Sequence, residues 1–496
     1  MAGDDDEFWA RPDVQAVFAR LESPWGLEAF QRQVAASGNC ACPVRLQGQV
    51  VTVDGETGER TATFGSAALP DGVLLKACGN RRATRCPAYS EVYKGDARHL
   101  VSAGLQGGKG VPESVAEHPA VFVTLTGPSF GPVHSAGASP RPCRPGPPGH
   151  RCPHGKALSC FARHDRDDPV PGEPLCTDCY RYCHHVLWNA LAPELWRRTT
   201  VYLSRKLARA VGTTPTALRT QVRLSFVRVA EFQRRGVVHL HVVVRADGPD
   251  GPGSSPPTWL SADLLGLAVR GAVAAVSVPF PVNLGQRVAP VARWGTLVDV
   301  SPLSGPASGR RAARYLAKYL QKATDTAGVL DRRLRAGDIS RLGDRGLSPH
   351  ETTLVEAAWR LGGKKELAGL HLRHWAHQLG YRGHCVAKSR TYSTTFGALR
   401  QARADHEAER RGAPPGGQLR RASFTYCGTG HKTPGDALLA RQWAQAAAEN
   451  RWLCWMAYDD EMWDRAHGAY VDRTPYWDEL ALDERPDELL DAHCAG

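Results

Sequence analysis

Two β-branched segments joined by a short turn constrain the fold of this chain more than any other feature. Residues 221–232 (QVRLSFVRVAEF) and 237–245 (VVHLHVVVR) are separated by the sequence QRRG. Their alternating pattern predicts strands, and the short connection predicts that they form an antiparallel hairpin. Residues 121–126 (VFVTLT) predict another strand, which ends at Gly127-Pro128. Residues 186–211, 310–324 and the tail from 435 onward show helical spacing, so we expect an α+β protein.

A histidine pair lies in the second strand of the predicted hairpin. His239 and His241 alternate with valine and leucine, so both imidazoles share one face of the strand. Two imidazoles on one face can bind a divalent metal and leave positions open for water or substrate. An odd-length turn over residues 234–236 would bring Glu231 beside His239, which makes Glu231 the candidate third ligand. The alternative is a histidine pair that faces solvent or fills the core without a metal.

A helix with paired tyrosines and lysines follows at residues 310–323 (RRAARYLAKYLQKA). Tyr315 and Tyr319 are four residues apart and share a helix face, and Lys318 and Lys322 form a neighbouring pair. Tyrosine hydroxyls next to cations are suited to nucleophilic attack on a phosphodiester. The alternative is a helix that buries its leucines and uses the tyrosines as spacers.

The cysteines cluster in the first part of the chain. Ten of the 14 cysteines lie between residues 40 and 183, and no secretory signal is visible, so metal ligands or free thiols are favoured over disulfides. The spacing Cys-x-x-Cys at residues 176–179 predicts a structural Zn²⁺ site, with His154 and Cys183 as competing ligands. Its expected ligands are Cys152, Cys160, Cys176 and Cys179, and a candidate second zinc set is Cys40, Cys42, Cys78 and Cys86. The alternative for each cysteine is a buried free thiol.

Basic charge is concentrated in the middle of the sequence. The formal net charge is +12, but residues 1–40 carry −4 and residues 456–496 carry −9, which leaves +25 between them. A basic body predicts a polyanionic partner, most simply nucleic acid. A GC-rich coding sequence would explain arginine in place of lysine but not this segregation of charge.

Basic and aromatic residues alternate in the segment 367–404, which contains no acidic residue. Such interleaving is typical of surfaces that bind DNA phosphates and exposed bases, whereas the alternative is a solvated helix face. The candidate DNA-binding residues are Arg373, Arg382, Lys388, Arg390, Tyr392 and Arg400.

Several classes of protein are disfavoured by missing sequence features. No apolar run of 18 residues or more predicts a membrane span, and the N-terminus lacks a basic region followed by an apolar one, so we expect a cytoplasmic protein. The chain contains no phosphate-binding loop, so no ATPase or helicase motif is visible.

The order of three motifs resembles the HUH endonuclease superfamily, in particular rolling-circle replication initiators. The motifs are FVTLT (122–126), VHLHVVV (238–244) and YLAKYLQK (315–322). Three longer stretches, at residues 78–93, 174–198 and 372–400, are similar to initiators of actinobacterial plasmids and integrative elements, so the resemblance covers roughly residues 40–440.

The resemblance implies a role for each motif. His239, His241 and Glu231 would bind Mg²⁺ or Mn²⁺, and Tyr319 would be the initiating nucleophile between Lys318 and Lys322. The attack would nick one strand of an origin, form a 5′-phosphotyrosyl intermediate and free a 3′-OH primer. A second tyrosine, Tyr315, would take part in rejoining the strand. A host helicase and a polymerase are the implied partners besides DNA.

The resemblance also implies a central antiparallel sheet of the HUH type with flanking helices. We expect an N-terminal cysteine-containing region (1–115), a catalytic domain (116–330) with a zinc module at about 140–185, a basic DNA-binding region (345–435) and an acidic helical tail (436–496). The alternatives are an HUH transposase or relaxase and a non-enzymatic, zinc-containing DNA-binding regulator. Relaxases usually place the tyrosine before the histidines, whereas here it follows them.

Overall fold

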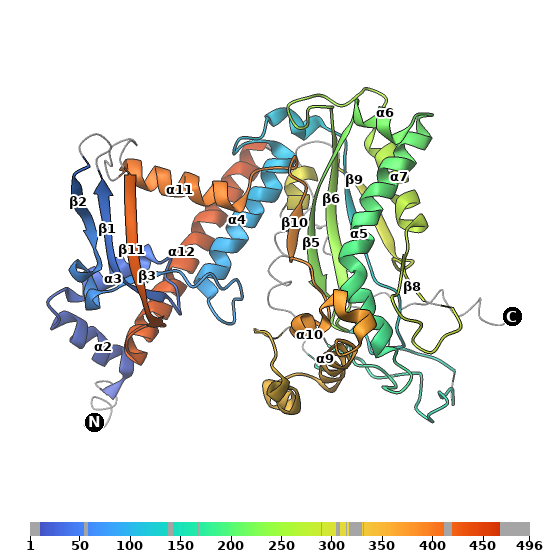
Figure 1. Cartoon of the computed structure of the whole chain (residues 1–496), viewed down its shortest axis with the longest axis horizontal. Coiled ribbons are helices and arrows are strands. Elements are labelled where there is room, and N and C mark those ends of the chain that lie inside the picture. Colours follow the sequence, from blue (N-terminus) through green and yellow to red (C-terminus); the bar gives the residue numbers. More distant parts are fainter. Residues whose placement is uncertain are drawn as a thin grey trace. The chain divides into compact units, whose positions relative to one another are not determined.

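The chain forms two compact units, each with its own antiparallel sheet (Figure 1). Among the described residues, the first, called the two-segment unit here, takes residues 10–97 and 395–466, and the second, the central unit, takes residues 98–394. The computed structural model describes residues 10–53, 58–136, 142–147, 149–165, 168–288, 290–303, 308–313, 315–316, 330, 332–410 and 419–466.

Strand β1 (Val44–Val53) is the centre of the sheet in the two-segment unit. It pairs antiparallel with β11 (Leu419–Thr429) along its whole length, and with β2 (Arg60–Gly65) and β3 (Leu74–Lys76) in successive parts. The helices of this unit are α2 (Pro12–Leu21), α3 (Gly26–Ala36), α11 (Phe396–Arg410) and α12 (Pro434–Ala466), and α4 (Pro87–Gln106) begins in it. The strand pair β1–β11 therefore joins the two sequence segments of this unit in one sheet.

Gly48 marks a close approach between β1 and β11. A Cβ atom at this position would overlap the carbonyl oxygen of Ser423, and the φ angle of +155° is rare for other residues. The register of the strand pair shifts between Arg45 and Leu46, as at a β-bulge. Glycine is therefore required here by the backbone of the partner strand.

A buried ion pair also links the two chain segments. Arg20 of α2 lies 2.8 Å from Asp436 at the start of α12 and 2.8 Å from Asp71, and Arg20 and Asp436 are 6% and 2% exposed. Burial opposes the charge of Asp71, but the hydrogen bond from Arg20 keeps the pKa of this carboxyl below its ordinary value. Removing one partner of such a pair costs about 3–5 kcal/mol, because the other charge stays buried.

The central unit is built on a five-stranded antiparallel sheet. The order is β10 (Val386–Lys388), β5 (Arg223–Phe232), β6 (Val238–Asp247), β4 (Ala120–Leu125) and β9 (Val298–Leu303), so β6 is the middle strand. Its predicted hairpin partner β5 lies beside it, and the strand predicted at 121–126 is β4.

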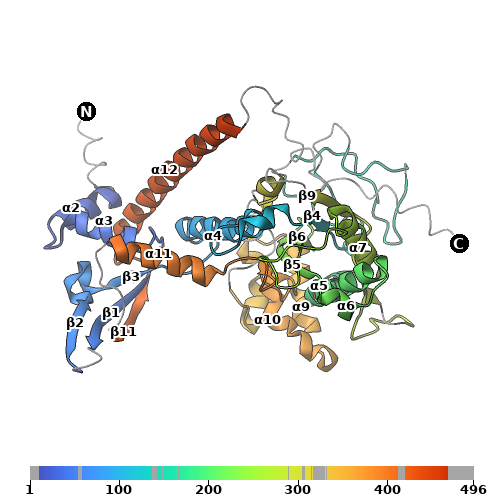
Figure 2. The same cartoon turned by 90° about the horizontal axis from the view of Figure 1, so that it is seen from above.

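Helices α5 (Tyr182–Ala210) and α7 (Ala262–Ala275) pack together over one face of this sheet (Figures 1 and 2). Alternate residues of β4 and β6, including Val123, Leu240 and Val242, join residues of both helices in one hydrophobic core. Ser261 caps α7, and Ser348 with Glu351 forms a capping box on α9 (Pro349–Leu361). The smaller elements are α6 (Pro215–Arg219), α10 (Leu372–Trp375), β7 (Val278–Pro279) and β8 (Val291–Ala292).

The predicted α+β class with antiparallel strands is confirmed, but the compact units divide the chain at other residues than the predicted domains. The range predicted as one basic region, 345–435, falls partly in each unit. The reason is the long-range pairing of β11 with β1, which local sequence patterns do not reveal. None of the helices among the described residues is long and apolar enough to cross a bilayer.

Candidate functional site

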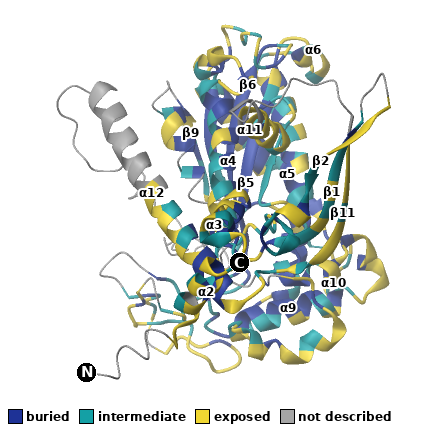
Figure 3. Cartoon of the chain, turned by 90° about the vertical axis from the view of Figure 1, so that its left-hand side faces the viewer, coloured by how far each residue is buried: buried dark blue, intermediate teal, exposed yellow. Residues whose placement is uncertain are grey.

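The histidine pair lies on the middle strand of the central sheet. Strand β6 is buried along its whole length (Figure 3), and His239 and His241 are only 3% and 2% exposed. The core valines and leucine occupy the alternate positions, so the imidazoles share the face of the sheet opposite to α5. Their ring centroids are 4.4 Å apart.

Glu231 lies beside this pair on β5. The register of the hairpin places Glu231 directly opposite His239, and the Glu231 Oε2 atom is 3.5 Å from His241 Nε2. Gln233 Nε2 lies 3.3 Å from His239 Nδ1, and Thr124 Oγ1 lies 3.5 Å from His241 Nδ1. Two imidazoles and a carboxylate therefore meet on one buried face, with neighbours that orient both rings.

Tyr315 extends this group from a following helical segment. Its ring centroid lies 5.5 Å from that of His241 and 5.2 Å from that of Phe122, with both rings edge-on. The next residue, Leu316, is fully buried and holds the segment in place. The other predicted residues of this helix, Lys318, Tyr319 and Lys322, lie outside the described residues.

Sequence reasoning missed two polar residues in the same row of the sheet. Thr124 pairs with His241 across β4 and β6, and Asp299 pairs with Thr124 across β4 and β9, so their side chains share the face of the histidines. The alternation in residues 298–303 was the available signal for Asp299. This row places a hydroxyl and a second carboxylate on the same face as the histidine pair.

Asn189 of α5 fixes the turn that precedes the histidine strand. This fully buried amide donates to the carbonyl oxygens of Gly236 (3.0 Å) and Leu379 (3.1 Å), and it accepts from the N–H of Val238 (3.1 Å). Two of these bonds reach the turn itself, at Gly236 and Val238, and the third reaches Leu379 outside the turn. Asn189 is therefore a positioning residue for the start of β6.

A buried ionic network closes the other end of β6. Arg245 donates to both carboxylate oxygens of Asp247 (2.6 and 3.0 Å), which also accepts from Ser225 (2.8 Å) and contacts His118 (2.8 Å). Burial opposes the charge of Asp247, but the hydrogen bonds from His118 and Arg245 keep its pKa below the ordinary value. The network fixes the strand four residues beyond His241.

Tyr392, which the sequence analysis gives as a candidate DNA-binding residue, belongs to this network and lies in the core instead of on the surface. Its side chain is fully buried, its hydroxyl donates to the carbonyl of Val101 (3.1 Å), and the guanidinium of Arg245 lies 5.4 Å from its ring centre. Burial raises the pKa of its hydroxyl. A Cβ atom at Gly104 would overlap the Tyr392 ring, which leaves no space for a base.

Replacing Tyr392 is therefore expected to affect stability rather than DNA binding. Tyr392→Ala should lower the free energy of unfolding by about 3–5 kcal/mol, because it leaves a cavity under a buried arginine. Tyr392→Phe removes only one hydrogen bond and should cost about 1 kcal/mol. Urea denaturation measures both, and fluorescence anisotropy measures the DNA affinity of the Phe variant. Unchanged stability with weakened DNA binding of Tyr392→Phe would contradict this assignment.

The other residues predicted to bind DNA lie in two different units. Arg373, Arg382, Lys388 and Arg390 belong to the central unit, whereas Arg400 lies on α11 of the two-segment unit. The Lys388 amine donates to the carbonyls of Ser389 (3.2 Å), Arg390 (3.4 Å) and Ser393 (2.8 Å), and burial lowers its pKa. Arg373 and Arg382 also donate to backbone carbonyls, and Arg390 and Arg400 are exposed.

The structure groups the cysteines differently from the sequence prediction. Cys152, Cys176 and Cys179 come together as expected, but their fourth neighbour is His154, whose Nδ1 lies 3.3 Å from Cys179 Sγ and 3.8 Å from Cys176 Sγ. Cys160 instead lies with His134, Cys143 and His164. Cys160, the fourth ligand expected from the sequence spacing, belongs to this other group because the bridge between Arg144 and Cys160 brings it beside Cys143.

The third cysteine group lies in the two-segment unit. Cys40, Cys78 and Cys86 come together, with 3.7 Å between the sulfurs of Cys40 and Cys86, whereas Cys42 is exposed and lies outside the group. Backbone N–H groups of Cys78 and Asn80 donate to the sulfurs of Cys40 (3.2 Å) and Cys78 (3.3 Å). Cys183, the competing zinc ligand, lies on α5 near Arg360 and belongs to none of the three groups.

Similarity to known proteins covers almost the whole chain. The family described as "Replication initiator protein, pSAM2" matches residues 26–445. The chain belongs to this replication initiator family. A curated "Replication initiator protein" of Streptomyces ambofaciens is 40% identical over 473 residues, which is 91% of this chain and 97% of that protein. No solved structure matches the chain.

The family assignment confirms the prediction of a replication initiator, and the match includes residues of both units. As a replication initiator, the protein takes part in starting DNA replication, which accounts for the basic middle of its sequence. Among the described residues of the central unit, the histidine pair, Glu231 and Tyr315 lie together on one face of the sheet.

Proposed function

We propose that this replication initiator is an HUH-type endonuclease that nicks one strand of its origin and later rejoins it, as in rolling-circle replication. The observation that carries the proposal is the position of Tyr315 against His241, on the sheet face that also bears His239 and Glu231. A nucleophile, two imidazoles and a carboxylate then share one site. Family membership favours an initiator over the transposase and relaxase alternatives.

His239, His241 and Glu231 are the proposed ligands of a Mg²⁺ or Mn²⁺ ion. The donor set fits, since imidazole nitrogens and a carboxylate oxygen are ordinary ligands of Mn²⁺ and the two functional groups already lie 3.5 Å apart. A bound ion would supply charge stabilisation for the phosphate under attack. Gln233 and Thr124 hold the two rings in the required orientation.

A tyrosine hydroxyl is the proposed nucleophile. Its oxygen forms a bond to phosphorus, the bond from phosphorus to the 3′ oxygen breaks, and the 3′ oxygen leaves as a hydroxyl after it takes up a proton. The phosphodiester becomes a 5′-phosphotyrosyl ester. Because one phosphate ester replaces another, the later rejoining step needs no separate energy source. The free 3′-OH would serve as a primer for a host polymerase, while a host helicase unwinds the duplex ahead of it.

We assign the first attack to Tyr319 and the rejoining step to Tyr315. The two tyrosines are four residues apart in the sequence, a spacing that in a helix would put both on one face. Lys318 and Lys322 flank Tyr319 in sequence and would favour its phenolate form by their charge. Arg390 and Arg400, which are exposed, are proposed to bind origin DNA together with Arg373, Arg382 and Lys388.

Zn²⁺ is the proposed occupant of the group Cys152, His154, Cys176 and Cys179. Three thiolates and one imidazole are a common structural zinc set. The group Cys40, Cys78 and Cys86 is a further candidate zinc set. Neither group contains a side chain placed to act as acid or base, so the role proposed for zinc is structural.

Trapping of a covalent adduct tests the proposed function. A library of single-stranded oligonucleotides from the origin region, labelled on the 3′ side, is incubated with full-length protein and Mn²⁺ or with EDTA. We expect a labelled protein band that resists denaturation in Mn²⁺ and is absent in EDTA. Sequence-specific binding without an adduct on any substrate would instead support the non-enzymatic, zinc-containing regulator.

A further inference from the structure

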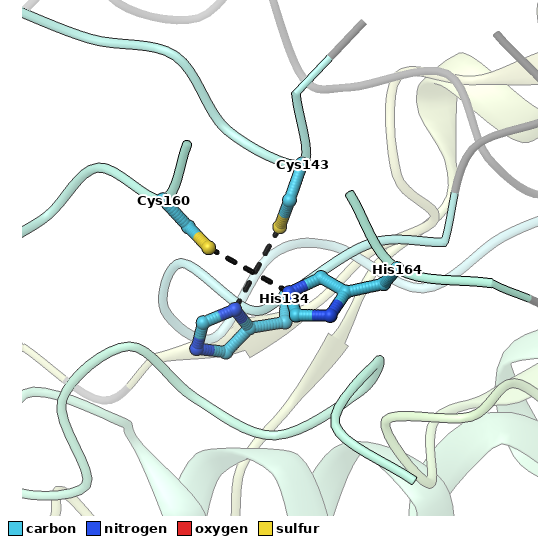
Figure 4. A group of neighbouring side chains, drawn as sticks. All are labelled: His134, Cys143, Cys160 and His164. Carbon is cyan, nitrogen blue, oxygen red and sulfur yellow. Dashed lines mark hydrogen bonds between the residues drawn. The ribbon is translucent and has the colours of Figure 1, made fainter. Parts of the chain in front are cut away.

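Four side chains of the central unit form a second site with a complete set of zinc ligands. His134, Cys143, Cys160 and His164 direct their donor atoms toward one another (Figure 4), all within 4.8 Å. Cys143 Sγ lies 3.7 Å from His134 Nδ1, and Cys160 Sγ lies 3.6 Å from His164 Nε2. A tetrahedral ion with bonds of about 2.0–2.3 Å separates its ligands by roughly 3.3–3.8 Å, so these distances fit Zn²⁺.

Neighbouring groups orient these ligands as in a metal site. Asp168 Oδ2 lies 2.7 Å from His164 Nδ1, so Nδ1–H donates to the carboxylate and Nε2 faces the sulfurs. A carboxylate behind the far nitrogen is typical of a zinc-bound histidine. The N–H of Ser135 donates to Cys143 Sγ (3.2 Å), as expected for a thiolate. The ligands are thus held from outside the cluster.

The two four-residue groups are interleaved along the chain. In sequence order the ligands form four pairs: 134 and 143, 152 and 154, 160 and 164, 176 and 179. The first and third pairs make one group, and the second and fourth pairs make the other. Each site therefore encloses half of the other in sequence.

We propose that His134, Cys143, Cys160 and His164 bind a Zn²⁺ ion of their own, and that this ion and the one proposed at Cys152, His154, Cys176 and Cys179 cross-brace residues 134–179. One ion alone would not fix the whole segment, because the two ligand pairs of the other site, and the loops that carry them, would stay unbound. The cross-brace rests on the zinc site proposed above, at Cys152, His154, Cys176 and Cys179. The second ion does not depend on that site.

The described residues of the segment 134–179 have little regular secondary structure or hydrophobic core to stabilise them. Among its described residues, those from 126 to 181 contain no helix or strand, only isolated bridges such as Val133 with Pro174 and Arg144 with Cys160. Phe161 is 59% exposed, so even its large apolar side chain contributes little core. Metal ions replace a hydrophobic core in segments of this kind, and their binding energy becomes folding energy.

The cross-braced segment also contacts the hairpin that bears the histidine pair. Arg234, in the turn between β5 and β6, donates to the carbonyl of Asp168 (3.0 Å). Gly172, with a φ angle of +99°, lies so close to the backbone of Arg234 that a Cβ atom would contact it at 2.7 Å. The second zinc site thus supports the turn through Asp168, the residue that orients His164.

Metal analysis of purified full-length protein tests the proposal without reference to nicking. Cys143→Ser should lose one zinc equivalent per chain relative to wild type, and Cys183→Ser, a nearby cysteine outside all groups, should lose none. NMR of the wild-type protein loaded with ¹¹³Cd is a second test, and it does not depend on whether a variant folds. We expect separate NMR signals for a site with two sulfur ligands and a site with three. Unchanged zinc in Cys143→Ser, or no two-sulfur signal, would overturn the second site.

Limited proteolysis tests the cross-brace itself. If the sites are interleaved, both Cys143→Ser and Cys152→Ser should speed cleavage throughout residues 142–181, because each variant releases loops of both sites. Cleavage confined to the loop of the altered site would contradict the cross-brace but not the presence of two zinc sites in the wild-type protein. Loss of the two-sulfur signal with nicking intact would refute this inference alone, whereas intact zinc sites without an adduct would refute only the proposed function.

Discussion

Tyr319→Phe is expected to abolish the covalent protein–DNA adduct, and Tyr315→Phe is expected to leave the adduct but prevent rejoining. Removing a nucleophile from a site of this kind lowers the rate by roughly 10⁴-fold or more. Denaturing gels with a labelled oligonucleotide measure the adduct, and a second, acceptor oligonucleotide measures strand transfer.

Phenylalanine is a suitable replacement because the contacts of Tyr315 with Phe122 and His241 are ring contacts that a phenylalanine can keep. Tyr426→Phe, at a 63% exposed position of β11, is the matched control and should behave as wild type. Loss of the adduct only in Tyr315→Phe would exchange the two roles. An adduct in the double variant would refute the tyrosine mechanism.

Alanine at His239 or His241 is expected to lower metal-dependent nicking by roughly 10³-fold, since a bound ion contributes several kcal/mol of charge stabilisation. Glu231→Gln keeps the shape of the side chain but removes its charge, so it should raise the Mn²⁺ concentration needed for half-maximal nicking. Nicking rates over a Mn²⁺ titration measure both effects, and circular dichroism checks the fold.

The control for the histidine variants is His184→Ala. His184 lies half-buried on α5, where it contacts Phe280 and Gln286, and it should leave nicking unchanged. Origin binding should persist in every variant, because none of them alters the residues proposed to bind origin DNA. Wild-type nicking by His239→Ala in EDTA would show that the pair binds no catalytic metal.

Local patterns predicted the core of the site because its geometry follows from one hairpin. The alternation of residues 237–245 sets the shared face of the histidines, and the turn length sets Glu231 opposite His239, as the register shows. Tyr315 reaches the same face only through the tertiary fold. Its motif was visible in sequence, but its contact with His241 was not.

Other features depend on contacts between distant residues and escaped prediction for that reason. The short spacing of Cys152 and Cys160 favoured one site, but the chain folds back so that Cys160 meets His134. Tyr392 lies among basic residues in sequence, and only the packing of α4 against it shows that it is buried. A local sequence pattern shows which residues are neighbours along the chain, but not which residues meet in the folded protein.

The pairing of β1 with β11 has a consequence for synthesis on the ribosome. Strand β1 ends at Val53 and its partner begins at Leu419, so the whole central unit is translated between them. At about 5–20 residues per second, β1 waits roughly 20–70 s for its partner strand. The central unit can fold during this interval, whereas the two-segment unit must finish last. A nascent chain halted before Leu419 would expose one edge of β1, which makes the first-made strand a target for chaperones.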